Sequence, residues 1–277
     1  MASPMKGRSA GRLLHGLGLV LTFAAVIFPF YWMVSSSFKT QNDLLASPPV
    51  WLFTPTLANY AQVFADEKVV YAVVNSLIVA LCSTGLSVLL GTPAAFALAR
   101  YDFRGKSDIW FWFISNRFIS PIVLALPVYV LAQGMGLLDT HLVLILMYIT
   151  FILPIVVWIC TDQFRSIPKE LEEAARLEGA SQFDVFWRIY LPLGLPGIAV
   201  SAIFGFIFSW NELLYALVLT RRTVQTAPVV ATSFMSGYEL PWGKIMATGT
   251  VIVLPVTIFA LLVSRHMVRG LTMGATK

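Results

Sequence analysis

Six long apolar runs divide this chain, and they constrain its fold more than any other feature. A helix needs roughly 20 apolar residues to cross the hydrocarbon layer of a bilayer. The runs that reach about this length are Leu13–Val34, Tyr71–Ala99, Ile109–Ala132, Leu142–Thr161, Gly197–Thr220 and Ile245–Val263. Lipid offers no hydrogen bonds, so spanning segments satisfy their own backbone groups, as helices do. Polar and apolar residues do not alternate along the runs, which argues against a membrane β-barrel.

The composition supports the same class of protein. The chain is 58% hydrophobic and 12% charged, whereas soluble domains carry about 25% charged residues. We therefore expect an all-α, polytopic membrane protein with six transmembrane helices. Residues 1–12 would form a tail and residues 13–277 a single membrane domain. The first run is longer than the roughly 7–15 apolar residues of a secretion signal, so we expect it to be retained.

The basic residues indicate how the chain is oriented. With the N-terminus inside, the inner segments hold 13 of the 19 Lys and Arg residues, the outer segments hold five, and Arg117 lies inside a run. Excess positive charge marks cytoplasmic loops. Both termini and the loop at about 162–195, between spans four and five, are therefore predicted to be cytoplasmic. The net charge of +5 then reflects topology, and no nucleic-acid partner is expected.

The loop at 162–195 carries signals for two short helices. Ser166 or Ile167 can cap the first helix, and Pro168 suits its first turn. Gly179 suits a left-handed helix end. Ser181, with Asp184 three residues later, predicts a capping box that opens the second helix. We expect Pro192 and Pro196 to stop the chain before the fifth span.

Four separated elements of this loop match one pattern, E-A-A-x3-G-x9-I-x-L-P, which is formed by Glu173, Ala174, Ala175, Gly179, Ile189, Leu191 and Pro192. The pattern resembles the coupling loop of the permease subunits of ABC importers. Three further segments are similar to permeases for sugar uptake: Ser37-Phe38-Lys39, Asn75-Ser76-Leu77 and Trp210-Asn211-Glu212. The ending from Arg269 to Ala275 is similar too. End to end, the chain resembles the shorter permease of the maltose-type carbohydrate importers.

This resemblance implies partners and a division of labour. It implies six spans, a homologous second permease, two cytoplasmic ATP-binding subunits and an extracytoplasmic solute-binding protein. It also implies that the seven residues of the pattern form the ATPase-coupling site, and that the chain lies in a bacterial inner membrane. ATP and Mg²⁺ would be bound by the partner subunits, because Arg100 stands where a phosphate-binding loop ending at Gly105-Lys106-Ser107 needs glycine. A homodimer stays open beside the heterodimer.

Polar residues within the spans are candidates for the solute pathway, because polar groups in lipid usually face the bundle interior. Asn116 and Arg117 lie in the third run, close to Pro121. Arg117 could donate to sugar hydroxyls, or it could be a snorkelling or structural arginine, paired for example with Glu212. Prolines let such a helix bend and free its carbonyl groups.

The fifth run adds a second set of pathway candidates. Phe204, Phe208, Asn211 and Tyr215 recur at spacings that place them on one face of a continuous helix. Aromatic rings stack on the apolar faces of sugars, while Asn211 and Glu212 can bond hydroxyl groups. An ordinary aromatic contact between helices is the alternative.

Other classes of protein find less support in the sequence. His15, His141 and His266 are far apart and show no metal-binding spacing, and Cys82 and Cys160 fall in apolar runs, where we expect them to be buried. A polytopic membrane enzyme would need a carboxylate or histidine cluster at one membrane face. An ion-coupled carrier would need inverted repeats and carboxylates at the midplane. The sequence predicts a transport subunit that is not an enzyme, and it does not name the sugar or sugar alcohol.

Overall fold

The computed structural model describes residues 6–234 and 240–273, and within them the side chains of residues 15–234 and 240–261. These residues are mainly helical and contain no strand. The basic side chains predicted at residues 6–12 and 265–277, and the signature ending at Ala275, lie wholly or partly outside the described side chains.

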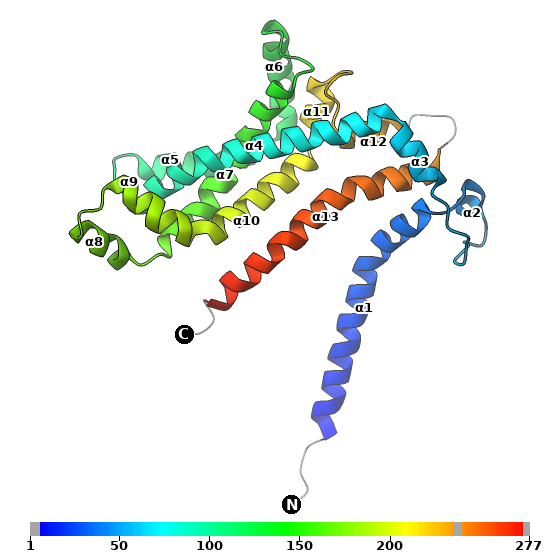
Figure 1. The fold of residues 1–277 in the computed structure, drawn as a ribbon, viewed down its shortest axis with the longest axis horizontal. Helices are drawn as coiled ribbons and strands as arrows, with labels where there is room; N and C mark the ends of the chain where they lie inside the picture. Colours follow the sequence, from blue (N-terminus) through cyan, green and yellow to red (C-terminus); the bar gives the residue numbers. More distant parts are fainter. Residues whose placement is uncertain (1–5, 235–239, 274–277) are drawn as a thin grey trace, which may run out of the picture. The chain divides into compact units, whose positions relative to one another are not determined.

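The helices follow one another in the order drawn in Figure 1. Their bounds are α1 (Lys6–Ser37), α2 (Gln41–Leu45), α3 (Ala58–Ala65), α4 (Glu67–Arg100), α5 (Lys106–Ser115), α6 (Pro121–Gly134), α7 (His141–Arg165), α8 (Lys169–Leu177), α9 (Gln182–Val185), α10 (Leu191–Trp210), α11 (Leu214–Leu219), α12 (Ala227–Ser233) and α13 (Trp242–Met273). A 3-10 turn, η1 (Asn116–Phe118), follows α5, and a π turn, η2 (Phe186–Tyr190), joins α9 to α10.

Five of these helical segments are long and apolar enough to cross a membrane, and they overlap five of the six predicted runs. They cover His15–Ser37, Glu67–Arg100, His141–Arg165, Gln182–Trp210 and Trp242–Leu261. The all-α, multi-pass class is therefore confirmed. The backbone of α1 is already helical from Lys6, before the predicted boundary at residue 12.

The third predicted run is not one continuous helix. The segments Lys106–Phe118 and Pro121–Gly134 meet at an angle of 94° and count as a sixth span only if the bent pair is taken together. Ser120, directly before Pro121, has the extended backbone that proline imposes on its predecessor. Proline also lacks the N–H that would continue the helix. The bend places Asn116 and Arg117 at the break, in η1.

The expected stop at Pro192 and Pro196 is wrong. The fifth span begins earlier, at Gln182, and runs through both prolines to Trp210. A wider π turn precedes them, with Leu191 N–H bonded to the Phe186 carbonyl, and such turns let a helix absorb an interruption. The helix ends instead at Trp210, and a new short helix, α11, starts at Leu214.

The chain forms two compact units. The first unit comprises residues 1–66 and 234–251. In it, the buried Lys39 donates to the Val50 carbonyl at 2.8 Å. The Asn59 amide donates to the carbonyls of Ser37 and Lys39, each at 2.8 Å. The segment Ser37-Phe38-Lys39 thus anchors the connection that leads into α2 and α3.

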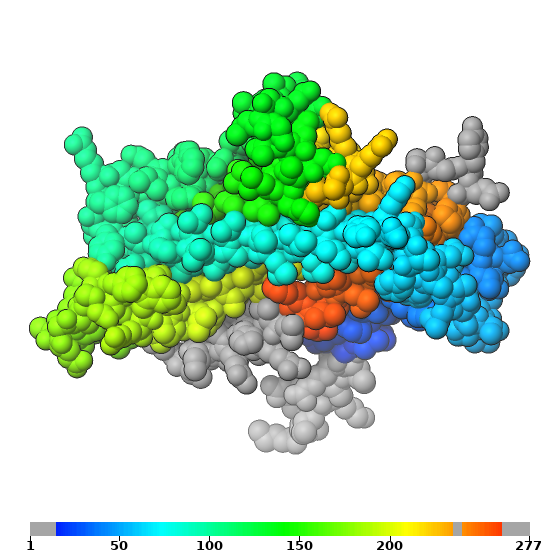
Figure 2. Space-filling model, turned by 45° about the horizontal axis from the view of Figure 1, so that its top comes forward, coloured from blue at the N-terminus to red at the C-terminus, as the bar shows by residue number. Residues whose placement is uncertain are grey.

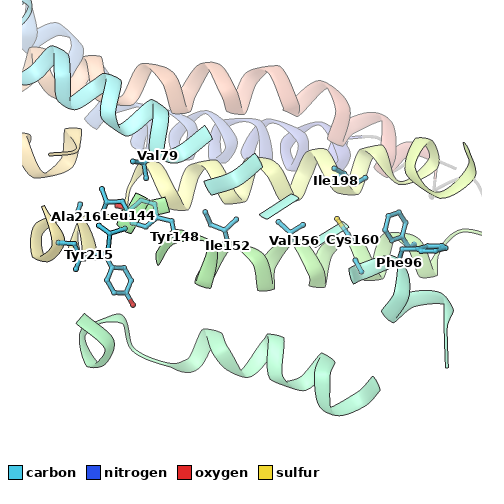
Figure 3. Close-up of a cluster of buried hydrophobic side chains, with 14 of the residues drawn as sticks. Val79, Phe96, Leu144, Tyr148, Ile152, Val156, Cys160, Ile198, Tyr215 and Ala216 are labelled. Atoms are coloured by element: carbon cyan, nitrogen blue, oxygen red, sulfur yellow. The ribbon is translucent and has the colours of Figure 1, made fainter. Parts of the chain in front are cut away.

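The second unit comprises residues 67–233 and 252–277, and its core lies between α4, α7 and α10. Figure 3 shows the row of side chains that α7 contributes, from Leu144 through Ile152 to Cys160. The helices pack closely, because a Cβ on Gly205 would come within 2.8 Å of Ile152. Small residues allow such close approach in membrane bundles. Cys160 is buried as expected, whereas Cys82 is exposed.

Candidate functional site

The predicted coupling loop forms a short amphipathic helix, α8, at one end of the second unit. Figure 1 shows α8 and α9 beyond the ends of α7 and α10, and this region is called the α8 end below. Helix α8 begins after Pro168, with Glu170 and Glu172 in its first turn. Carboxylates there favour the positive end of the helix dipole. Neither Ser166 nor Ile167 caps this helix, because its N-cap position is Pro168.

Gly179 forms the joint between α8 and α9, as the sequence predicts. Its φ is +89°, a left-handed conformation in which side chains are strained. Gly179 N–H bonds the Arg176 carbonyl, and Ala180 N–H bonds the Ala175 carbonyl, both at 3.0 Å. This pattern closes the helix end. A Cβ at Gly179 would meet no atom within 4 Å, so only backbone strain demands glycine here.

The second short helix opens with the capping box that the sequence predicts. Ser181 Oγ accepts from Asp184 N–H, and the Asp184 carboxylate accepts from Ser181 N–H at 3.3 Å. Two N–H groups at the helix start are therefore satisfied by a reciprocal pair. The joint and the box together fix the direction in which the chain leaves α8.

Glu172 ties α8 to the membrane helices, and sequence reasoning did not single it out for this contact. Its carboxylate accepts from Arg100 Nε at 3.0 Å, from the Tyr190 hydroxyl at 3.0 Å and from Arg176 at 2.5 Å. The Arg100 side chain is only 3% exposed, and that of Glu172 12%. Arg100 ends α4 and Tyr190 ends η2. One carboxylate thus joins three elements.

The charge state of Glu172 follows from these contacts. Burial alone would raise the pKa of its carboxyl group. Hydrogen bonds from Arg100 and Tyr190, together with the charges of Arg100 and Arg176, outweigh the burial and hold this pKa below its usual range. The Glu172–Arg100 pair therefore stays ionised at neutral pH, and this ion pair, called the clamp below, holds α8 to the end of α4. No sequence spacing connects Arg100 with Glu172, since 72 residues separate them.

The face of α8 opposite Glu172 is exposed, and it is called the open face below. Glu170, Glu173, Ala174 and Leu177 recur at i, i+3, i+4 and i+7, and all four are exposed. Leu177 is 91% exposed, which is unusual for a leucine on a structured helix. Of the predicted coupling residues, Glu173 and Ala174 lie on this face, whereas Ala175 packs against the core.

The remaining coupling residues lie behind this face. Ile189 and Leu191 pack against the core, and Pro192 is exposed. A hollow of about 450 Å³ runs along the joint, lined by Ala175, Glu178, Gly179, Ala180, Asp184, Arg188 and Ile189. Three of the four elements of the pattern thus meet around one joint, through Ala175, Gly179 and Ile189, and their coupling role stays a prediction.

The structure brings together one pair of predicted pathway residues and separates others. The guanidinium of Arg117 lies 5.3 Å from the ring centre of Phe208, a cation–π contact. Phe204 stacks on Phe208 at 6.2 Å along α10. The predicted single stripe ends there, because the helix breaks at Asn211.

Glu212 and Tyr215 belong to the core beyond that break. The Glu212 carboxylate accepts from the Tyr148 hydroxyl at 2.9 Å and from the N–H groups of Tyr215 and Ala216. It therefore caps the start of α11 rather than pairing with Arg117. Tyr215 is 3% exposed, so its ring faces packed side chains. Asn211 donates to the Ile207 carbonyl at 2.8 Å.

A second network joins Asp139, the first turns of α4 and the loop after α11, and this region is called the α11 end below. The sequence did not predict this network. Asp139 has φ 60°, and its carboxylate accepts from the N–H groups of four successive residues, 221 to 224, at 3.0–3.2 Å. Asn75 donates to the carbonyls of Thr223 and Gln225, each at 3.1 Å. Ser76 accepts from Ala227 N–H at 2.8 Å. Part of the predicted Asn75-Ser76-Leu77 segment thus holds the loop after α11.

Among the described residues, no group of three or more His, Cys, Asp or Glu side chains could hold a metal ion. His141 instead bonds the Asn75 side chain at 2.9 Å.

Long apolar helices, with an open polar helix clamped to their ends, define a multi-pass membrane protein. The family described as "Binding-protein-dependent transport system inner membrane component" matches residues 87–273. The chain belongs to this family of ABC transporter permeases.

Curated relatives match along nearly the whole chain. The "Trehalose transport system permease protein SugB" of Mycobacterium tuberculosis is 38% identical over 94% of this chain and 94% of its own length. The "Diacetylchitobiose uptake system permease protein DasC" of Streptomyces coelicolor is 32% identical over 99% and 100%. A solved bacterial ABC transporter for import of the acidic polysaccharide alginate shares the fold, with a TM-score of 0.75 at 20% identity over 96% of this chain and 99% of that chain.

Proposed function

We propose that this chain forms half of the translocation pathway of an ATP-driven importer for a sugar, oligosaccharide or sugar alcohol. A homologous second permease would supply the other half, and an extracytoplasmic binding protein would deliver the solute. Relatives named for the uptake of trehalose and diacetylchitobiose support the carbohydrate class. The excess of Lys and Arg in alternate loops supports an orientation with the α8 end and both termini in the cytoplasm.

The observation that carries the coupling role is the pairing of an open face with a clamped face on one helix. On the open side, Glu173, Ala174 and Leu177 can enter a groove of a partner ATPase subunit. On the clamped side, Glu172 holds Arg100 and Tyr190. A movement imposed on α8 would therefore pass into α4 and α10 without first being absorbed by the loop.

The chain's own part in the cycle is mechanical. ATP and Mg²⁺, bound by the partner subunits, would supply the free energy, and this chain would convert their approach into a shift of its helices. The left-handed joint at Gly179 sets the angle between α8 and the following helix. The Arg117–Phe208 contact, at the break in the third span, is our candidate for solute contact, because it joins a donor and an aromatic face.

Glu173→Lys tests the docking role. This change reverses a charge on the open face without touching the Glu172 clamp, so ATPase subunits should co-purify at reduced stoichiometry. Asp108→Lys is the matched control, because Asp108 is also exposed but lies on α5. Equal recovery of ATPase with both variants and the unchanged chain would contradict the proposal.

Uptake into membrane vesicles tests the energy source. Import should require ATP and persist after ion gradients are dissipated. Uptake that collapses with the gradients would indicate an ion-coupled carrier, and solute modification by the purified chain would indicate a membrane enzyme.

A further inference from the structure

Residues 46–57, which connect α2 to α3 and are called the outer loop below, expose apolar side chains. Between Asp43 and Asp66 the sequence has no charged residue, whereas about a quarter of the residues of a soluble domain are charged. Leu52 is 95% exposed and Trp51 57%. Figure 2 shows this stretch, in medium blue, at the surface of the first unit. Exposed apolar surface of this kind marks a contact with protein or membrane.

One aromatic contact places the outer loop beside the membrane helix α1. The Trp51 ring meets the Trp32 ring edge to face, with ring centres 5.3 Å apart. A helix rises about 1.5 Å per residue, so Trp32 lies about 8 Å before the end of the span at Ser37. That depth corresponds to the boundary between hydrocarbon and headgroups, where tryptophan is enriched. The outer loop therefore returns to the level of the membrane surface.

The surface around this contact continues the apolar surface of α1. Phe28 lies one turn before Trp32, with ring centres 6.1 Å apart, and is 49% exposed. Tyr31 is 52% exposed. Within the described residues, the most apolar window of this span contains no buried residue. Trp51 thus extends the surface that a spanning helix presents to its surroundings in the membrane.

Lys39 holds the outer loop in this position. Its side chain is buried and donates to the Val50 carbonyl at 2.8 Å. Its ammonium group lies 4.5 Å from the ring centre of Trp32 and 5.0 Å from that of Phe53, and both are cation–π distances. The loop is therefore anchored on both sides of Leu52, which stays exposed between the two anchors.

We propose that Trp51 and Leu52, called the loop tip below, insert into the headgroup region of the outer leaflet, where phospholipid covers them. The inference rests on the orientation in the proposed function, which puts the end of α1 outside the cell. Neutral aromatic and aliphatic side chains suit the boundary between hydrocarbon and headgroups. The contact with Trp32 makes the loop tip continuous with the membrane surface of α1. Lys39 is then a positioning residue, because it acts on the lipid contact through the loop backbone.

A fluorescent dye on a single cysteine tests the lipid contact, in the whole importer reconstituted into vesicles. Cys82 and Cys160 are replaced first, so that only the introduced thiol reacts. Leu52→Cys carries the dye, Asn42→Cys in α2 is the control in water, and Phe23→Cys in α1 is the control in lipid. Phospholipids that carry a nitroxide should quench most of the emission from the Leu52 and Phe23 positions and little from Asn42. Iodide in the water should quench mainly the dye at Asn42.

A second variant tests the positioning role of Lys39. Lys39→Met keeps an apolar stem but removes the ammonium group, so the loop loses its bond at Val50. Quenching of the Leu52 dye by nitroxide lipids should fall, and quenching by iodide should rise. The dye at Phe23 should be quenched by lipid as before, which shows that the chain is still inserted. Gln62→Met, at an exposed residue of α3, is the matched control and should leave the Leu52 dye unchanged.

Two results would overturn the inference. One is a Leu52 dye that iodide quenches as strongly as the dye at Asn42, which would place the loop tip in water. The other is a Leu52 dye shielded from both quenchers, which would assign the loop tip to a protein partner. Failure of the proposed orientation is distinguishable from both. In that case a membrane-impermeant maleimide would not label Asn42→Cys on intact spheroplasts, while nitroxide lipids would still quench the Leu52 dye.

Discussion

Each end of the second unit is held together by a buried or partly buried carboxylate, but the two carboxylates bond different kinds of group. At the α8 end, Glu172 joins side chain to side chain, with Arg100, Tyr190 and Arg176 as partners. At the α11 end, Asp139 and Asn75 join side chain to backbone. A buried ion pair holds helices together yet depends strongly on each partner. Backbone contacts fix the path of a loop whatever its side chains are.

The bonds at the α8 end match the role proposed for it. The α8 end must transmit displacement between helices, so a compact charged clamp suits it. At the α11 end the loop backbone is held by Asp139 and Asn75, while the Arg221 guanidinium bonds the Tyr129 hydroxyl. Each end also contains a glycine in a left-handed conformation, Gly179 and Gly136, and a Cβ at either position would meet no atom within 4 Å.

The largest effect should come from breaking the charged clamp. Glu172→Ala leaves the Arg100 guanidinium buried without its carboxylate, which should destabilise the protein by about 3 kcal/mol. Thermal unfolding in detergent measures the loss. Asp102→Ala is the control, because its pair with Lys106 is 96% exposed on the aspartate side and should contribute nothing measurable. Equal melting temperatures of the two variants would refute the clamp.

A smaller loss is expected at the α11 end. Asp139→Ala removes the acceptor of four backbone N–H groups and should cost about 2 kcal/mol, since water reaches part of the loop. Asp139→Asn keeps one acceptor and a residue that tolerates positive φ, so it should lose less. Hydrogen exchange of residues 221–224 should accelerate in both variants. If Asn proves as disruptive as Ala, the carboxylate is not what orders the loop.

Valine substitutions at two glycines distinguish the effect of backbone strain on stability from an effect on the coupling of ATP hydrolysis to transport. Gly179→Val and Gly136→Val each force a β-branched residue into positive φ, at a cost of about 1–2 kcal/mol. Stability should therefore fall alike. Only Gly179→Val should reduce solute imported per ATP hydrolysed, because that joint carries α8. Normal coupling in Gly179→Val, or equal uncoupling in both, would dismiss the joint as the transmitting element.

The smallest effect is a pH dependence at the α11 end. The folded pKa of Asp139 lies below its unfolded value of about 4. Its stabilisation is then fully present above the unfolded pKa and declines as pH falls toward the folded one. The difference in unfolding temperature between the natural chain and Asp139→Asn should therefore be constant near neutrality and shrink below about pH 4. A difference that grows with acid would reverse the assigned sign.

Several features of the site could be predicted because their causes are local. The span lengths follow from runs of apolar residues, and the capping box at Ser181 depends on a residue three positions away. The joint at Gly179 follows from the conformation that only glycine adopts easily.

Other predictions were wrong for an equally physical reason. Pro192 and Pro196 look like helix stops, but a π turn before them lets the helix continue. The stripe from Phe204 to Tyr215 assumed an unbroken helix, and the break at Asn211 sends Tyr215 into the core. Local rules assume that a helix continues until a residue such as proline ends it, whereas packing decides whether the helix ends at that residue.

The sequence by itself determined a multi-pass helical membrane protein with a jointed helix in one loop. Only the tertiary structure decided that Glu172 meets Arg100, that Arg117 lies over Phe208 and that Asp139 holds residues 221–224. The partners in the first and last contacts lie 72 and more than 80 residues apart. Such contacts depend on how whole helices pack, and no sequence pattern identifies two residues so far apart in the chain as partners.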